Sequence, residues 1–96
     1  MDASALEFLK EILNTPSPSG FERPVQEIVR RYVKPFADKV TTDSHGNVIA
    51  VKNPNAPLRV MYAGHADQIG LLVQFINADG FISTQTIGGW DPQVLI

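Results

Sequence analysis

The first part of the chain alternates apolar and polar residues with the period of an α-helix. Between residues 5 and 13 the apolar positions recur three or four apart, which places them on one helix face. These positions are Ala5, Leu6, Phe8, Leu9, Ile12 and Leu13. Ser4 followed by Glu7 matches a capping box and predicts where the helix begins. Pro16 and Pro18 end it, because proline restricts its own backbone and that of the preceding residue.

A second helical pattern covers residues 21–34, and Pro35 ends it. Ser19 with Glu22 forms another capping pattern, and Pro24 is compatible with a helix only because it falls in the first turn. A group of apolar residues shares one face of this helix, and we interpret that face as core packing and not as a cofactor site. They are Val25, Ile28, Val29, Tyr32, Val33 and Phe36.

After residue 37 the periodicity changes to that of β-strands. Residues 38–43 and 47–52 flank the sequence Ser-His-Gly, which predicts a hairpin with Gly46 at a positive φ angle. His45 falls in this turn, and we interpret it as a solvated turn residue and not as a ligand.

The remaining chain continues the strand pattern. Residues 58–63 and 68–76 are apolar enough to form strands on either side of the sequence Gly-His-Ala-Asp. A turn at 77–80 predicts a second hairpin, completed by a strand at 81–87. Two helices followed by short strands predict an α/β or α+β fold. The chain stops on three apolar residues, 94–96, which we interpret as a strand just begun in the opening part of a longer protein.

Length and composition limit the classes of function. A chain of 96 residues forms one domain at most, and its 44 % hydrophobic content is typical of a globular protein. A net charge of −2 without a run of Lys or Arg disfavours nucleic-acid binding. The apolar runs are too short to cross a membrane, and the acidic amino terminus predicts a cytoplasmic protein without a signal peptide. Since cysteine is absent, any metal must be bound by imidazole and carboxylate groups.

His65 and Asp67 interrupt the apolar sequence between residues 61 and 73. In a strand, residues two apart point to the same side, so the two side chains can share a face. If the strand ends at Gly64, the pair lies at its carboxyl end, where open α/β sheets place ligand sites. In one interpretation the pair is structural and stabilises a bend by a hydrogen bond. In the other, the imidazole binds a cation and the carboxylate orients the ring or binds as well.

Neither interpretation completes a catalytic site within this chain. A catalytic zinc ion needs about three protein ligands and an open position, and no glutamate occurs after Glu27. Asp91, within Gly-Trp-Asp-Pro, is interpreted as a turn former, and Trp90 as a residue that covers a strand or packs at an interface.

Several segments, taken in order, resemble the amino-terminal part of the M42 family of metallo-aminopeptidases. They are TPSPSGFE, TTDSHGNVIA, MYAGHADQIGLLV, INADGFI and IGGWDPQVLI. The similarity extends over essentially the whole chain. It implies two amino-terminal helices followed by sheet strands, the start of a zinc-peptidase-like α/β catalytic domain at residues 1–70. Residues 71–96 would then begin an inserted β-barrel domain that contributes to oligomer assembly.

The resemblance also implies an enzyme that removes amino-terminal residues from peptides by means of two divalent metal ions, zinc or cobalt. It assigns the first metal-ligand histidine to His65 and the aspartate that orients this histidine, a catalytic residue of the family, to Asp67. The remaining ligands would lie beyond residue 96, so the chain alone is expected to be inactive. The complete protein is expected to be a homo-oligomer.

Two positions depart from the common family pattern Gly-His-Met-Asp-Glu-Ile-Gly. Ala66 in place of methionine changes packing only, whereas Gln68 in place of glutamate removes a charge beside the site and leaves the substrate preference open.

Two other hypotheses stand beside the peptidase. One is a non-enzymatic assembly module or truncated remnant. The other is an endoglucanase-type glycan hydrolase, which requires two carboxylates flanking the scissile bond, and no such pair is marked here.

Overall fold

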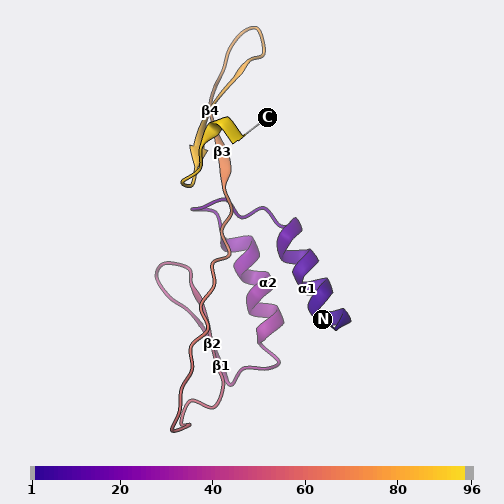
Figure 1. Ribbon diagram of the computed structural model, residues 1–96, viewed down its shortest axis with the longest axis vertical. Coiled ribbons are helices and arrows are strands. Elements are labelled where there is room, and N and C mark those ends of the chain that lie inside the picture. Colours follow the sequence, from indigo (N-terminus) through magenta and orange to yellow (C-terminus); the bar gives the residue numbers. More distant parts are fainter. Residues whose placement is uncertain (1, 95–96) are drawn as a thin grey trace.

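Two helices followed by two β-hairpins form an elongated molecule with principal extents of 61 × 31 × 22 Å (Figure 1). The computed structural model describes residues 2–94. In chain order the elements are α1 (Ala3–Asn14), α2 (Arg23–Val33), β1 (Lys39–Thr42), β2 (Val48–Val51), β3 (Gly70–Ile76), β4 (Ile82–Ile87) and the 3₁₀ helix η1 (Pro92–Val94). The expected mixture of two amino-terminal helices and later strands is confirmed.

The first helix begins earlier than its capping box predicts. Asp2 is the N-cap, and its Oδ1 accepts a hydrogen bond of 2.7 Å from the backbone N–H of Ala5. Ser4 lies inside the first turn, where its hydroxyl donates to the same carboxylate oxygen at 2.9 Å. The prediction of Ser4 as the cap was wrong, because the Asp2 carboxylate already satisfies a free amide of the first turn.

The second helix begins without a side-chain cap. Glu22 occupies the N-cap position, and its carboxylate accepts a hydrogen bond from the backbone N–H of Gly20 at 2.6 Å instead of capping a helix amide. Pro24 lies in the first turn, as expected. Ser19 does not cap the helix, contrary to the prediction, because its hydroxyl bonds to a residue 48 positions further along the chain.

The apolar faces of the two helices pack together beside the first hairpin. Val25 and Ile28 of α2 are the buried hydrophobic residues among residues 2–94. The rings of Phe8 and Tyr32 stack with centroids 3.9 Å apart, so α1 covers α2 through an aromatic contact. Phe36, expected on the buried face, remains 62 % exposed because it follows the end of α2. No helix in the described part of the chain is long and apolar enough to cross a membrane.

Both predicted hairpins form. In the first, β1 and β2 pair antiparallel, Gly46 has a φ angle of +90°, and Asp43 accepts hydrogen bonds from the turn amides of His45 and Asn47. In the second, β3 and β4 pair antiparallel around a turn in which Gly80 has a φ angle of +86°. Side-chain acceptors and glycines therefore define both turns, as the sequence predicts.

The strand expected at residues 58–63 is not formed. Its side chains are strongly exposed, including Met61 at 87 % and Tyr62 at 95 %, and no strand within residues 2–94 pairs with it. A strand needs a neighbour for its backbone N–H and C=O groups, so an apolar sequence alone does not produce one. The strand expected at 94–96 is also absent at Val94, which belongs to η1, and the other two positions lie outside the described residues.

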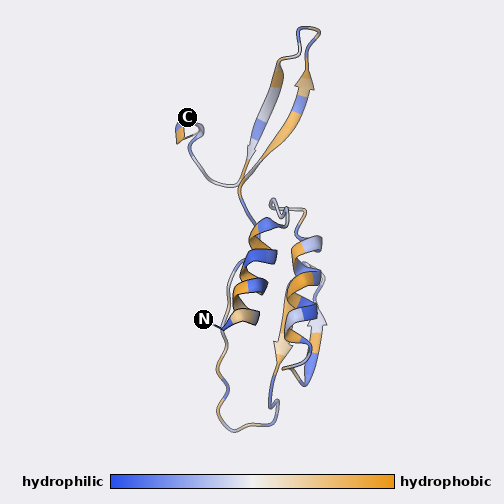
Figure 2. Ribbon diagram, turned by 90° about the vertical axis from the view of Figure 1, so that its right-hand side faces the viewer, coloured by the Kyte–Doolittle hydropathy of each residue, from blue (hydrophilic) through white to orange (hydrophobic). Residues whose placement is uncertain are grey.

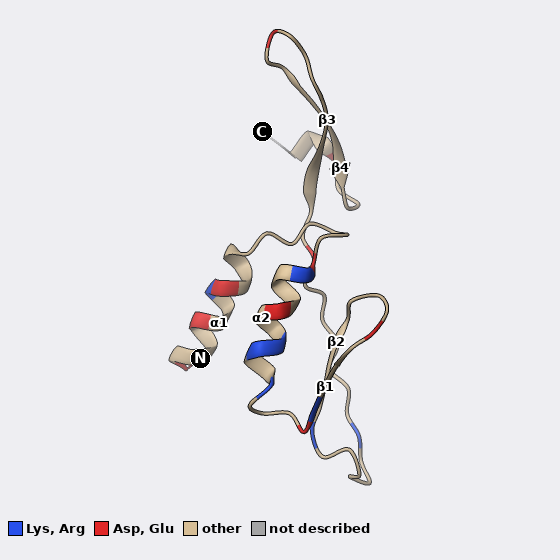
Figure 3. Cartoon of the chain, turned by 180° about the vertical axis from the view of Figure 1, so that it is seen from behind, with Lys and Arg blue, Asp and Glu red and all other residues tan. Residues whose placement is uncertain are grey.

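The β3–β4 hairpin extends away from the helices and carries little charge. In Figure 3 no Lys or Arg is coloured on β3 or β4, and Figure 2 shows β3 as largely hydrophobic. Its large apolar side chains are nevertheless exposed. They include Leu71, Leu72, Val73, Phe75 and Ile76. An exposed apolar surface of this kind is typical of segments that pack against other protein surfaces.

Replacing Gly70 by alanine should destabilise the protein, because the added Cβ would lie 3.2 Å from Cβ of Pro18, and the backbone hydrogen bonds of Ser17 and Ser19 to Gln68 keep Pro18 from moving away. We expect a loss of about 1–3 kcal/mol in the free energy of unfolding, measured by chemical denaturation of the protein made from its whole reading frame. Gly64→Ala is the control, since no non-neighbouring heavy atom of residues 2–94 lies within 4 Å of a Cβ added there. Equal losses in the two variants would contradict the contact with Pro18.

Candidate functional site

The candidate site forms where residues 17–19 run beside residues 66–68. The N–H of Gln68 donates to the carbonyl of Ser17 at 2.8 Å, and the N–H of Ser19 donates to the carbonyl of Gln68 at 3.2 Å. Pro18 and Gln68 thereby form an isolated parallel bridge. The Ser17 side chain is fully buried, and its hydroxyl donates to the carbonyl of Ala66 at 3.0 Å. The loop before α2 therefore fixes the backbone on both sides of Asp67.

The local sequence suits this pairing. Proline lacks an N–H, and Pro18 lies between two residues whose backbone groups make the hydrogen bonds, so no donor is lost. Gly70 has no side chain, which lets Pro18 approach the start of β3. After Ser19, Gly20 has a φ angle of +92° and the N–H of Phe21 donates to the carbonyl of Pro18, so the chain turns directly into α2.

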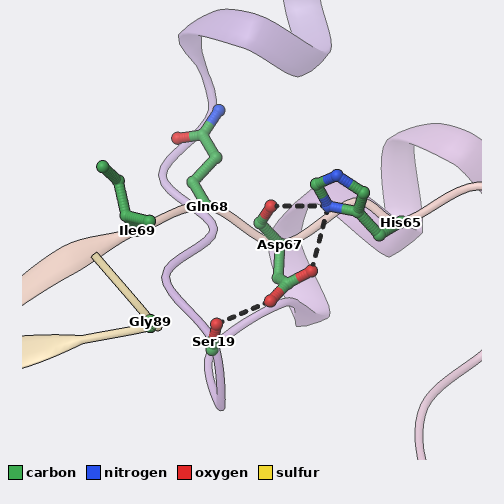
Figure 4. Close-up of a pocket in the computed structure, with 7 residues that line it drawn as sticks. Ser19, His65, Asp67, Gln68, Ile69 and Gly89 are labelled. Atoms are coloured by element: carbon green, nitrogen blue, oxygen red, sulfur yellow. Dashed lines mark hydrogen bonds and ion pairs between the residues drawn. The ribbon is translucent and has the colours of Figure 1, made fainter.

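His65 is held by Asp67 through one ring nitrogen (Figure 4). Its Nδ1 lies 3.1 Å from the backbone carbonyl oxygen of Asp67 and 3.2 Å from Oδ1 of the same residue. Both oxygens are acceptors, so the geometry requires Nδ1 to carry the proton in the neutral ring. The other ring nitrogen, Nε2, then keeps its lone pair and points away from Asp67 in Figure 4, on a side chain that is 86 % exposed.

Asp67 uses its second carboxylate oxygen in a different contact. Its Oδ2 accepts a hydrogen bond of 2.6 Å from the hydroxyl of Ser19. This hydrogen bond is the main reason that the pKa of Asp67 lies below its usual value, and the contact with His65 lowers the pKa further. Asp67 therefore remains ionised at neutral pH and can accept from the imidazole N–H.

Two pockets meet at the pair formed by His65 and Asp67. The one in Figure 4 is lined by Ser19, His65, Asp67, Gln68, Ile69, Gly88 and Gly89. The other lies towards α2 and the turn of the first hairpin, and it includes His45 and Glu22. Within residues 2–94, no cluster of three or more His, Cys, Asp or Glu side chains is placed to hold a metal ion. The described chain thus offers one imidazole nitrogen and its carboxylate partner to a ligand in these pockets.

The other candidate residues have local structural contacts. His45 lies in the turn of the first hairpin, as expected, and its backbone N–H donates to Asp43. Asp91 accepts a hydrogen bond from the N–H of Gln93 at 3.0 Å and shapes the turn into η1, in agreement with its interpretation as a turn former. The indole N–H of Trp90 donates to the carbonyl of Ile87, at the end of the second hairpin.

Ser17 and Ser19 are the site residues that sequence reasoning missed. The capping pattern assigned Ser19 to α2, and Ser17 showed no pattern beyond its place between two prolines. Their partners are 49 and 48 positions away in the chain. A serine next to proline is ordinary in a turn, so the sequence contained no local signal for these contacts.

Comparisons with known proteins identify the family of the chain. The sequence profile described as M42 glutamyl aminopeptidase matches residues 46–96. A lysyl aminopeptidase from Pyrococcus furiosus is 42 % identical over 91 residues, which are 94 % of this chain and 26 % of the relative. The crystal structure of a TET aminopeptidase from a marine-sediment Thaumarchaeota archaeon gives a TM-score of 0.86 at 38 % identity, covering 97 % of this chain and 26 % of that one. The chain therefore belongs to the M42 glutamyl aminopeptidase family.

One solved structure carries a different description. A Thermotoga maritima protein described as an endoglucanase gives a TM-score of 0.77 at 32 % identity, covering 91 % of this chain and 28 % of that one. In all three comparisons the chain spans about a quarter of the length of its relative.

Replacing Ser17 by alanine should destabilise the site, because the buried hydroxyl donates to the carbonyl of Ala66. We expect a loss of about 1–3 kcal/mol in the free energy of unfolding. Ser83→Ala, at an exposed position of β4, should change it by less than about 0.5 kcal/mol. Denaturation of both variants measures the difference, and a neutral Ser17→Ala would show that this hydrogen bond contributes nothing to stability.

Proposed function

We propose that the complete protein is a metal-dependent aminopeptidase in which His65 binds a divalent cation and Asp67 orients His65. One observation carries the proposal: Nδ1 faces two oxygen acceptors of Asp67, so the exposed Nε2 is the nitrogen with a free lone pair. Metal-binding histidines usually donate their other ring N–H to such an acceptor, which fixes the tautomer and the ring orientation. Membership of the M42 family supports the same assignment.

The donor set fits zinc or cobalt. A neutral imidazole nitrogen is a good ligand for either ion, and the chain contains no cysteine that would favour a thiolate site. When bound, two such ions would supply Lewis-acid polarisation of the scissile peptide carbonyl. The part of this chain is to present Nε2 of His65 and, through the ionised carboxylate of Asp67, to keep the ring in its binding orientation.

The rest of such a metal site would come from outside the described residues. Within residues 2–94 no third His, Cys, Asp or Glu joins the pair, whereas a catalytic zinc ion needs about three protein ligands. The relatives are about four times as long as this chain and have room for the remaining ligands. For the 96-residue chain alone we expect weak cation binding and no peptidase turnover.

We further propose the domain division and setting that the resemblance implies. Residues 1–70 would form the amino-terminal part of a zinc-peptidase-like catalytic domain, and residues 71–96 would begin a β-barrel insertion that contributes to a homo-oligomer. The exposed apolar side chains of β3 support the second assignment, because they need other protein surface to cover them. Peptides would be the substrates, and the cytoplasm the location.

The two departures from the family pattern are compatible with this proposal. Gln68 contributes its backbone N–H and carbonyl to the pairing with residues 17–19, and neither group depends on the side chain. Its side chain points away from His65 in Figure 4. Ala66 likewise uses its carbonyl, as acceptor for Ser17. The loss of a negative charge at Gln68 would therefore act on substrate preference and leave the His65–Asp67 pair intact.

Glycan hydrolysis is the second candidate, since one structural relative is described as an endoglucanase. That reaction needs one carboxyl group that remains protonated to serve as the acid. Both oxygens of the Asp67 carboxylate are instead engaged, Oδ2 by Ser19 and Oδ1 by His65, so this group is placed to orient the imidazole. The geometry therefore favours the peptidase.

Metal removal separates these hypotheses. The protein made from the whole reading frame should release amino-terminal residues from aminoacyl chromogenic substrates, lose this activity in a chelator and regain it with zinc or cobalt. Cleavage that persists in the chelator, or glucan hydrolysis without peptide hydrolysis, would refute the proposal. Absence of both activities would favour a non-enzymatic module or remnant.

Substitution of the pair tests the residue roles. His65→Ala should lose the bound metal and the activity together, because no other group replaces its Nε2. Asp67→Asn should keep the fold but lower metal affinity by roughly 10- to 100-fold, since the amide is a poorer acceptor for the imidazole N–H. Metal content per subunit and chelator competition measure both effects, and unchanged metal content in the two variants would return the pair to a purely structural role.

A further inference from the structure

The hydroxyl of Ser19 is the one group outside the His65–Asp67 pair that hydrogen-bonds the Asp67 side chain in the described part of the chain. The Oγ–Oδ2 distance of 2.6 Å is that of a charge-assisted hydrogen bond, for which roughly 2.5–2.7 Å is usual. The two oxygens of the carboxylate thus have different partners: Oδ2 accepts from Ser19, and Oδ1 faces Nδ1 of His65 (Figure 4). Rotation of the carboxylate about its side-chain bond would disturb both contacts at once.

Ser19 is itself held by the backbone. Its N–H donates to the carbonyl of Gln68, and it follows Pro18, whose ring fixes one backbone angle. The turn closed by the N–H of Phe21 on the carbonyl of Pro18 encloses Ser19. The hydroxyl therefore reaches Asp67 from a fixed position, unlike a surface serine on a free loop.

The helix does not use this hydroxyl. Ser19 has the sequence context of an N-cap, yet α2 begins at Arg23 with Glu22 as its cap residue and without a side-chain cap hydrogen bond. A serine that capped α2 would accept a hydrogen bond from a backbone N–H of the first helical turn. The Ser19 hydroxyl instead donates to a carboxylate 48 positions away. The Ser19 hydroxyl therefore makes its side-chain hydrogen bond with Asp67 and not with the helix.

We propose that Ser19 is a positioning residue for the site. Its hydroxyl holds the Asp67 carboxylate in the orientation in which Oδ1 faces Nδ1 of His65. The carboxylate thereby joins the backbone carbonyl of Asp67 in keeping the proton of His65 on Nδ1, which leaves Nε2 free for a divalent cation. The statement about the cation rests on the proposed function, whereas the statement about the tautomer does not. Ser19 would act only through Asp67 and would not itself touch metal or substrate.

The first measurement is the tautomer of His65 in the metal-free protein made from the whole reading frame. Solid-state ¹⁵N spectra of histidine-labelled protein, at an alkaline pH where imidazoles are neutral, distinguish Nδ1–H from Nε2–H. The His65 signals are identified by their loss in His65→Ala. We expect Nδ1–H in the parent protein, in Ser19→Thr, which keeps a hydroxyl, and in the control Ser83→Ala. In Ser19→Ala the backbone carbonyl of Asp67 still accepts from Nδ1, so only the contribution of Oδ1 is lost, and Nε2–H should rise to a detectable minor fraction.

The second measurement is the affinity for zinc in competition with a chelator. Ser19→Ala should weaken binding by about three- to ten-fold, less than the roughly 10- to 100-fold expected when a direct partner of the ligand is lost. Ser19→Thr should restore most of this loss. In an Asp67→Asn background, Ser19→Ala should lower the zinc affinity by less than about two-fold. The effects of two substitutions are not additive when one residue acts through the other.

The outcomes are separable. An unchanged tautomer in Ser19→Ala would overturn the role of Ser19. The role would also be overturned if Ser19→Ala lowered the zinc affinity by the same factor in the parent protein and in Asp67→Asn. If the parent protein takes up neither zinc nor cobalt, the proposed function is wrong, and the ¹⁵N spectra alone decide whether Ser19 positions the pair. Circular dichroism checks folding, and Ser19→Cys, which is close in size but a weak donor, replaces Ser19→Ala if that variant does not fold.

Discussion

The hydrogen bonds between residues 17–19 and 66–68 are the constraint on which the rest of the site depends. They join the loop between the two helices to the segment that precedes β3. Ser17, fully buried, anchors the loop on the carbonyl of Ala66. Without this pairing, the segment around His65 would have no backbone hydrogen-bond partner from another segment, just as residues 58–63 pair with no strand of the described chain. A parallel contact of two short segments thus provides the rigidity that a full sheet provides elsewhere.

This rigidity matters because the functional groups themselves are exposed. An ion pair between exposed side chains is worth little, since solvent screens it and the side chains must be ordered. The His65 side chain is 86 % exposed and that of Asp67 is 39 % exposed. Their geometry therefore depends on Asp67, which contacts the imidazole through both its backbone carbonyl and its carboxylate. Hydrogen bonds of the surrounding backbone and of the Ser19 hydroxyl fix the Asp67 side chain, as burial fixes side chains in a protein core.

Burial of apolar side chains is distributed unevenly over the described residues. Packing is concentrated around α2, which contacts both α1 and β2, and includes the buried Val25 and Ile28 and the stacked rings of Phe8 and Tyr32. The β3–β4 hairpin, by contrast, keeps its large apolar side chains in solvent. Because hydrophobic stabilisation is proportional to the apolar area removed from water, the hairpin contributes mainly through its own backbone pairing. The chain spans about a quarter of the length of its relatives.

The sequence alone determined the two helices and both hairpins, because these depend on local periodicity and glycine turns. It also brought His65 and Asp67 together, but the strand ending at Gly64 on which that prediction rested is not formed, and the pair lies in an irregular segment. It failed at residues 58–63, where an apolar pattern predicts a strand but only a neighbouring segment can form one. It also misplaced Ser19, whose capping pattern is local while its partner is distant. Tertiary structure alone decided that Ser17 and Ser19 hold the backbone of Ala66 and the carboxylate of Asp67, because these contacts join segments almost fifty positions apart.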